Sequence, residues 1–306
     1  MKNSNLYLYR SGYRAEVDWK KGRVISAPPR QVEDDGYGHW FLPPEERPFR
    51  GLSSRFADFS KTWKKDFKKD FEIFVAEFGL LGITGLPEDA YKPPMYGESW
   101  EEEIDWWLHY AGEVYRLLRL YRIIRRARVD KNFDAEGALD EIIIFEQAYK
   151  VSHTCKLQDN GQYNWTEHKE ETPFVKAVWK ENGIETGQVF PETMLPIDAA
   201  PYVLASTISR NLAGGVILGM GKVTPSKKSP IGYSIAEQRY TNYLLAAIYN
   251  DLWELIRNEK PVEICAHSEC ANIFVPQRKT GEYCSDACKQ AAYRKRKAET
   301  PKNNGQ

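Results

Sequence analysis

Four of the five cysteines in this 306-residue chain lie close together near its C-terminal end. They form two pairs, Cys265-x4-Cys270 and Cys284-x3-Cys288, separated by thirteen residues. Thiolates are preferred ligands of structural zinc, and two close pairs let each pair occupy one edge of a tetrahedron. The spacing therefore predicts a structural zinc site with these four cysteines as ligands.

Two alternatives to a site of four thiolates involve the same residues. Disulfide pairing is typical of secreted chains, and the first residues of this sequence contain no apolar signal core. His267 is an alternative ligand in place of Cys265 or Cys270. We prefer the cysteines, because a histidine ligand would leave one thiol of the first pair without a role.

The residues between and after the two pairs predict a small finger. Residues 273–275 have the pattern of a strand, residues 279–282 that of a turn, and residues 283–284 that of a return strand. Ser285 is a suitable N-cap for a helix that runs to about Lys297. The order is a knuckle, meaning the turn that contains Cys265 and Cys270, then a hairpin and then a helix. This is the order of a treble-clef-like finger.

The same helix carries most of the cations at this end of the chain. From residue 265 onward there are eight Lys and Arg against four Asp and Glu, which leaves 35 basic and 39 acidic residues in 1–264. An acidic body with a basic end is typical of a chain whose last segment contacts a polyanion. An alternative is that these cations only complement the helix dipole. The predicted nucleic-acid contacts are Arg278, Lys279, Lys289, Arg294, Lys295, Arg296 and Lys297. Tyr293, in the same helix, is expected to pack against the hairpin rather than to stack on a ligand.

This segment also resembles a known family. The residues that carry the likeness are Cys265-Ala266-His267-Ser268-Glu269-Cys270, Phe274, Tyr283-Cys284-Ser285, Cys288 and Tyr293-Arg294-Lys295-Arg296. Together they resemble the C-terminal finger of bacterial CGNR-type zinc-finger proteins, which often follows a helical ABATE domain. They are also similar to the YCS-x-x-C-(K/R)-Q-x-A-Y-R-x-R ending of uncharacterised bacterial and phage proteins. The likeness covers about 35 residues and implies a DNA-binding regulator. Where the family has its CGNR motif, this chain has Cys288-Lys289-Gln290-Ala291, and its last cysteine pair is one residue closer.

The rest of the composition predicts a folded, mainly α protein. Apolar residues make up 42% and aromatic residues 13% of the chain, which excludes wholesale disorder. No run of about 18 apolar residues is present, so we expect no membrane span. Because the first residues lack an apolar signal core, we expect a cytoplasmic location without a membrane partner. Periodic apolar residues and caps predict helices over residues 53–78, 99–128, 134–145, 197–216 and 235–258.

Strands are expected only at two places in the body. Residues 5–27 predict a small N-terminal β meander, and residues 148–166 predict a hairpin, while residues 221–233 have the composition of a loop. The predicted organisation is a mostly helical body over 1–260, the zinc finger with its basic helix over 261–298 and a disordered tail over 299–306.

No catalytic constellation is found in the sequence. Asp18-Trp19-Lys20 matches a triplet of metal-dependent nucleases, but it lacks the further carboxylates that such a site needs. His109 is expected in the packed core, and His153 with Cys155 makes only half of a metal site. The sequence thus favours a DNA-binding transcriptional regulator that is not an enzyme, with DNA preferred over RNA as partner. The ligand of the body is left open, as is a homodimer. The alternatives are an interaction protein, in a phage or defence setting, whose finger is a structural cap, and an enzyme or toxin with an unrecognised site in the body.

Overall fold

The computed structural model describes residues 6–8, 15–26, 51–62, 64, 66–89, 92–148, 151–158, 161–169, 174–225, 233–267, 269–270, 272–276 and 281–299. The chain forms two compact units. Unit 1 comprises Met1–Pro87, Pro93–Arg122 and Arg210–Gln306, and unit 2 comprises Glu88–Lys92 and Ile123–Ser209.

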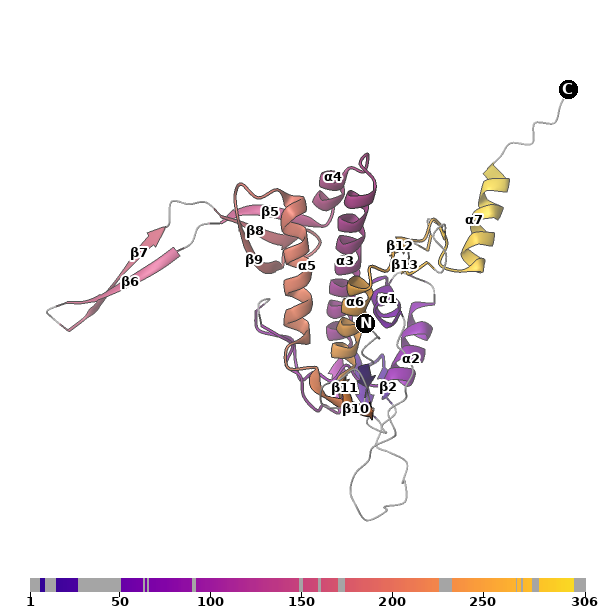
Figure 1. Cartoon of the computed structure of the whole chain (residues 1–306), viewed down its shortest axis with the longest axis horizontal. Coiled ribbons are helices and arrows are strands. Elements are labelled where there is room, and N and C mark those ends of the chain that lie inside the picture. The colour runs from indigo at the N-terminus through magenta and orange to yellow at the C-terminus, as the bar shows by residue number, and fades with distance from the viewer. Residues whose placement is uncertain are drawn as a thin grey trace, which may run out of the picture. The chain divides into compact units, whose positions relative to one another are not determined.

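Unit 1 combines a helical core with three small sheets (Figure 1). Its helices are α1 (Leu52–Ala57), the 3-10 turn η1 (Asp58–Ser60), α2 (Phe67–Phe78), most of α3 (Ile104–Val129), α6 (Leu244–Arg257) and α7 (Asp286–Glu299). The first sheet has the order β1 (Leu6–Leu8), β11 (Tyr233–Thr241) and β10 (Ile217–Pro225). The second is antiparallel and contains β2 (Ala15–Asp18), β3 (Arg23–Ser26) and β4 (Glu101–Glu103). The third is the short hairpin of β12 (Glu263–Ile264) and β13 (Ile273–Phe274).

Aromatic side chains fill the core between α1, α2 and α3. Phe71 and Phe74 of α2 are buried, and the Phe71 ring lies 5.3 Å from that of Trp107 in α3. The Phe59 ring lies 5.0 Å from that of Phe74 in an edge-to-face arrangement. Such pairs contribute about 0.5–1.5 kcal/mol beyond the area that they bury. The periodic apolar residues of the helix predicted over 53–78 are thus aromatic side chains that pack α2 into the core.

A buried carboxylate in unit 1 links α3 to α6 and to residues 210 and 211. Glu113 of α3 accepts hydrogen bonds from Asn211 Nδ2 at 2.7 Å and from the Tyr249 hydroxyl of α6. Its second oxygen lies 3.0 Å from a guanidinium nitrogen of Arg210. Both Arg210 and Asn211 belong to the C-terminal end of α5 (Pro196–Leu212). Because a buried charge is tolerated only when it is paired, this cluster fixes residues 210 and 211 against the middle turns of α3 and α6.

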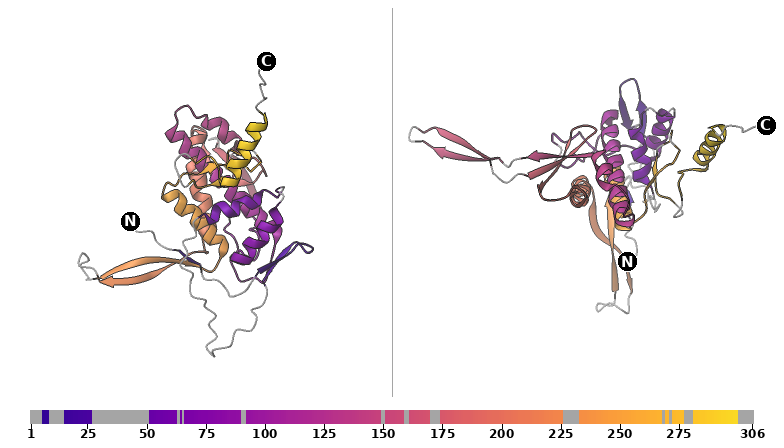
Figure 2. Two further views of the ribbon diagram at one scale, coloured as in Figure 1. Left: turned by 90° about the vertical axis from the view of Figure 1, so that its right-hand side faces the viewer. Right: turned by 90° about the horizontal axis from the view of Figure 1, so that it is seen from above.

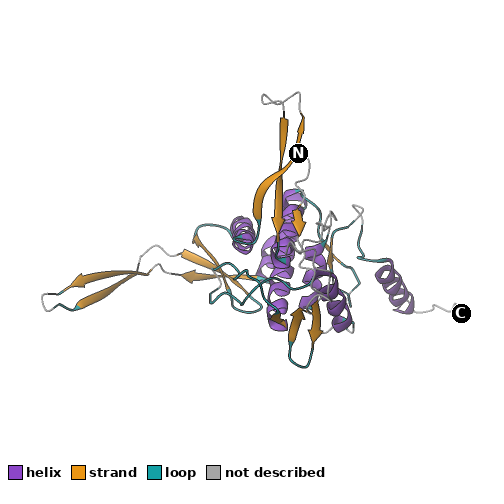
Figure 3. Cartoon of the chain, turned by 90° about the horizontal axis from the view of Figure 1, so that it is seen from below, coloured by secondary structure: helices purple, strands orange, loops and turns teal. Residues whose placement is uncertain are grey.

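Unit 2 is built around an antiparallel sheet with the order β5 (Ile143–Ala148), β8 (Phe174–Trp179) and β9 (Glu185–Pro191). It also contains α4 (Ala135–Asp140) and most of α5. Strands β6 (Val151–Leu157) and β7 (Tyr163–Lys169) form a separate two-stranded ribbon, seen in orange in Figure 3. The hairpin expected over residues 148–166 is therefore confirmed, with strands that end three residues later.

Helices are present where most were predicted, but their limits differ. Helix 53–78 is interrupted, because α1 and η1 end at Ser60 and α2 begins only at Phe67. Helix 197–216 corresponds to α5, and Asp134 caps α4 by accepting the N–H of Gly137 at 2.9 Å. The start predicted for helix 99–128 is wrong. Residues 101–103 form strand β4, and α3 begins only at Ile104.

The mainly α expectation holds only in part, because thirteen short strands accompany the helices in the described part of the chain. The loop expected over 221–233 lies partly in strand β10 and meets β11 at Tyr233, and both strands form a long hairpin (Figure 2, left). The start predicted for helix 235–258 is therefore wrong, because α6 begins only at Leu244. Strand β1 pairs in parallel with β11 rather than joining an N-terminal meander, a long-range contact that local pattern does not reveal.

Candidate metal centre

The four cysteines near the C-terminal end meet in space. The Sγ atoms of Cys265, Cys270, Cys284 and Cys288 all lie within 4.8 Å of one another. The Cys270–Cys284 and Cys284–Cys288 sulfur pairs are each 3.5 Å apart, and all four cysteines are free thiols. A tetrahedral zinc with Zn–S bonds of about 2.3 Å requires sulfur–sulfur edges of about 3.8 Å. The cluster is thus close to the size that a tetrahedral metal ion needs, and it can hold one.

The first cysteine pair is placed by the β12–β13 hairpin. Glu263 pairs with Phe274 and Ile264 with Ile273, and the Cys265 N–H then donates to the Asn272 carbonyl at 2.8 Å. Strand β13 was expected to pair with residues 283–284, and this is wrong, since its partner precedes the first cysteine. The predicted turn at 279–282 lies partly outside the described residues. Pairing across the knuckle brings the first two sulfurs together, which a later return strand would not do.

The second pair is placed by the start of α7. Ser285 Oγ accepts the N–H of Cys288 at 3.2 Å, which confirms the predicted N-cap. Cys288 therefore lies in the first helical turn, where backbone N–H groups and the helix dipole favour a thiolate. The Ala266 N–H donates to the Glu282 carbonyl at 2.8 Å and joins the two halves of the finger. In the described part of the chain, the group of side chains that could hold a metal ion consists of these four cysteines and does not include His267.

The pKa values of the thiols bear on how this cluster could hold a cation. Burial is the largest influence on Cys270 and Cys284 and raises the pKa of each thiol above its usual value. Burial also raises the pKa of Cys288, but hydrogen bonds with Ser285 and the neighbouring cysteines outweigh it and leave that pKa lowered. Four adjacent thiolates repel one another, so a divalent cation is the counter-charge that allows all of them to ionise.

The predicted nucleic-acid contacts are gathered mainly on α7. Five of the seven lie on this helix and are exposed, and Lys295 also lies 3.7 Å from the Glu269 carboxylate. They are Lys289, Arg294, Lys295, Arg296 and Lys297. Arg278 and Lys279 fall outside the described residues. The expectation that Tyr293 packs against the hairpin is wrong, because its side chain is 61% exposed.

The contact between Lys64 and the finger was not foreseen from sequence. Lys64, which follows η1, donates from Nζ to the side-chain oxygen of Asn272 in the knuckle. Lys61 is buried and lies 3.4 Å from Asp58. Residues near 61 carry no local signal for this role, because the partner lies more than two hundred positions away.

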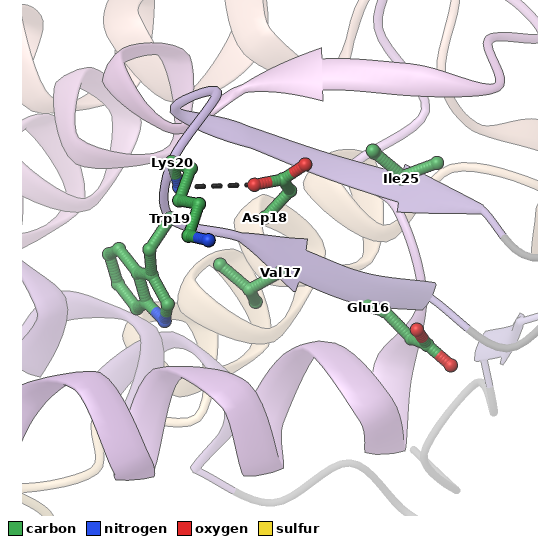
Figure 4. Close-up of a pocket in the computed structure, with 6 residues that line it drawn as sticks. All are labelled: Glu16, Val17, Asp18, Trp19, Lys20 and Ile25. Atoms are coloured by element: carbon green, nitrogen blue, oxygen red, sulfur yellow. Dashed lines mark hydrogen bonds between the residues drawn. The ribbon is translucent and has the colours of Figure 1, made fainter.

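A concave region apart from the cysteine cluster lies beside β2 and β3, with a volume of about 500 Å³ (Figure 4). It is lined by Glu16, Asp18 and Lys20 among others, which includes both polar members of the nuclease-like triplet. Asp18 Oδ1, however, accepts the backbone N–H groups of Lys20 at 3.0 Å and Lys21 at 3.1 Å. The Trp19 indole donates to Glu72 Oε1 at 2.6 Å. These hydrogen bonds stabilise the turn and its packing on α2. In the described residues, the side chains that could hold a metal ion are the four cysteines and do not include Asp18 or Lys20.

No protein-family model, curated protein or solved structure is significantly similar to this chain. None of the helices in the described ranges is long and apolar enough to cross a membrane. The class of the protein therefore rests on its own geometry: it is a chain of helices and small sheets with a C-terminal four-cysteine cluster that can hold a metal ion.

Proposed function

We propose that the chain is a zinc-finger nucleic-acid-binding protein in which α7 contacts DNA phosphates, and that it acts as a transcriptional regulator. The observation that carries the proposal is the link between metal and helix. Cys288 belongs to the metal cluster and to the first turn of α7, and the same helix presents five exposed cations. A metal held there fixes the direction of the basic helix.

The metal is proposed to be structural zinc in a treble-clef-like finger. Four thiolates complete a tetrahedral shell and leave no open position for water. The finger has few buried apolar residues of its own, among them Val262 and Ile273. Zinc binding therefore supplies the folding free energy that so small a core lacks.

DNA is the proposed partner because phosphates attract flexible cations without a demand for exact geometry. Each phosphate neutralised by Lys or Arg releases counterions, so the affinity falls steeply as salt rises. The resemblance of residues 265–296 to the finger of CGNR-type proteins supports a DNA-binding role. The acidic residues of the body disfavour contact elsewhere and leave the basic end as the point of attachment.

The metal part of the proposal is tested by zinc release from the purified full-length chain. The wild type is expected to contain one zinc per chain, and Cys284→Ser to lose most of it, because three thiolates bind zinc more weakly than four. Cys155→Ser is the matched control, since Cys155 is exposed and outside the cluster. Equal zinc content in Cys284→Ser and the wild type would contradict the ligand assignment.

The nucleic-acid part is tested by fluorescence anisotropy with a labelled DNA duplex over a salt series. Wild-type binding is expected to weaken with salt. Joint replacement of Arg294, Lys295, Arg296 and Lys297 by Ala should flatten the slope by about 0.9 for each phosphate that the variant no longer neutralises. Zinc content is measured in both proteins to confirm an intact finger. Absence of binding to any nucleic acid at low salt would overturn the proposal.

A further inference from the structure

The outward face of α7 carries an aromatic ring among its cations. Tyr293 is 61% exposed and makes no ring contact or hydrogen bond with the described residues. Lys289 and Lys297 lie four residues before and after it, and both are exposed. Residues four apart share one face of a helix and are separated by about 6 Å along its axis. The helix thus presents a row of lysine, tyrosine and lysine.

The opposite face of α7 is occupied by the finger itself. Cys288 and Ala291 are half-buried, and Lys295 lies 3.7 Å from Glu269 of the knuckle. These positions are three and four residues apart and share one side of the helix, on which Cys288 and Ala291 face the finger and Lys295 remains exposed. The tyrosine is therefore on the side that the fold of the finger does not use, and a packing role does not account for it.

From this face we infer that α7 binds an unpaired nucleic-acid strand, with a base stacked on the Tyr293 ring and the neighbouring phosphates on Lys289 and Lys297. The inference rests on the proposed function and specifies the strand that it binds. In a duplex both faces of each base are covered by the stack, so an exposed ring meets only edges and sugars. In a single strand every base offers a free face, and aromatic rings between cations are the usual means of binding it.

Charge and shape both favour this ligand. The lysines carry positive charge on either side of the ring, which complements a strand with a phosphate at each nucleotide. Stacking is tolerant of base identity, so binding should depend weakly on sequence and strongly on unpaired character. Arg294 and Arg296 are exposed on the same helix and add to the field that attracts the strand.

The test compares full-length, zinc-loaded protein with a single-stranded DNA and the duplex made from it. Affinity for the single strand is expected to be higher than for the duplex at equal salt. Tyr293→Ala should weaken single-strand binding roughly 5- to 150-fold, the range for loss of one base–aromatic stack. Tyr293→Phe retains the ring and should bind as the wild type does.

The salt dependence separates stacking from charge. Tyr293→Ala should leave the slope of affinity against salt unchanged, whereas Lys289→Ala should reduce it by about 0.7 on a single strand. A 2-aminopurine base in the strand should be quenched by wild type and Tyr293→Phe and not by Tyr293→Ala. Zinc content serves as the check that each variant keeps its finger.

The outcomes distinguish the two proposals. Binding to neither probe at low salt would overturn the proposed function and this inference together. Duplex binding at least as tight as single-strand binding, with Tyr293→Ala equal to the wild type on both, would overturn the inference alone. Single-strand preference lost in Tyr293→Ala and kept in Tyr293→Phe is the result expected.

Discussion

At the scale of single residues, Glu102 holds a loop that has almost no regular structure. Its carboxylate is 1% exposed and accepts four N–H groups. These are the backbone N–H groups of Leu81 at 2.8 Å, Gly82 at 2.7 Å and Ile83 at 3.1 Å, and Trp107 Nε1 at 2.9 Å. Burial outweighs these donors and raises the pKa of Glu102 to about 7.

This raised pKa makes one component of stability depend on pH. Between the usual value of 4.5 and about 7, the folded protein holds a proton at Glu102 that the unfolded chain has released. The contribution is therefore full below 4.5 and is lost as pH rises through 7. We expect wild type to lose on the order of 3 kcal/mol relative to Glu102→Gln over this range, since one pKa unit corresponds to about 1.4 kcal/mol.

Urea unfolding of both proteins at several pH values measures this difference. Asp251, whose pKa burial raises to about 6, titrates in both proteins and cancels in the comparison. A constant difference in unfolding free energy from pH 4.5 to 7.5 would show that Glu102 does not change its protonation in this range.

At the scale of elements, the segment after η1 ties the finger to the body. Lys64 donates to the Asn272 side chain, and the Asn272 carbonyl accepts the N–H of the metal ligand Cys265. A second connection joins Arg122 of α3 to Glu263 of β12, at 3.1 Å. Asn272 and the ion pair between Arg122 and Glu263 are thus among the contacts that join the finger to the helical core of unit 1.

Lys64→Ala should loosen the finger without emptying it. The variant is expected to keep its zinc, because none of the ligands is changed. Amide protection over residues 262–276 should fall roughly tenfold, since a hydrogen bond to a charged group contributes about 1.5 kcal/mol. Hydrogen exchange read by mass spectrometry measures this change.

Lys69→Ala is the matched control, because Lys69 is an exposed residue of α2. It should leave the protection of the finger unchanged. If Lys64→Ala also leaves that protection unchanged, the contact between Lys64 and Asn272 does not hold the finger in place.

At the scale of the whole molecule, the proposed zinc site and the main core are expected to be separate sources of stability. The core residues Trp107, Leu117 and Tyr249 are fully buried among helices that contribute no metal ligand. On the proposed zinc site, the finger should instead depend on its metal, because structural zinc contributes about 10–16 kcal/mol in small finger domains. Loss of metal should therefore unfold one end of the chain and spare the rest.

Treatment of the full-length protein with a zinc chelator tests this separation. We expect loss of hydrogen-exchange protection over residues 261–299 and in the contact segment 58–64, while α2, α3 and α6 remain protected. Addition of zinc should restore the protected state. Loss of protection throughout the helical core on chelation would show instead that the body cannot fold without its finger.

The sequence by itself determined the metal centre, because the ligand set depends on residue chemistry and on short spacings. The order Cys265, Cys270, Cys284 and Cys288 placed two sulfur pairs within reach of one ion, and Ser285 marked the start of the helix that carries the last of them. The main helices were also predictable, since a period of 3.6 residues is a local property. The phenylalanines of α2, which recur every three or four residues, are an example of this local pattern.

Only the tertiary structure decided the features that depend on distant partners. Strand β11 was predicted as a helix because its pairing with β1 joins residues more than two hundred positions apart. Glu102 has the pattern of a helix cap, but its carboxylate oxygens accept backbone N–H groups of a loop about twenty residues earlier. Lys64 has the pattern of a surface lysine, and the fold places it on the knuckle. Tyr293 has the pattern of a packed residue, and the fold leaves it exposed among cations, because the knuckle occupies the other face of α7.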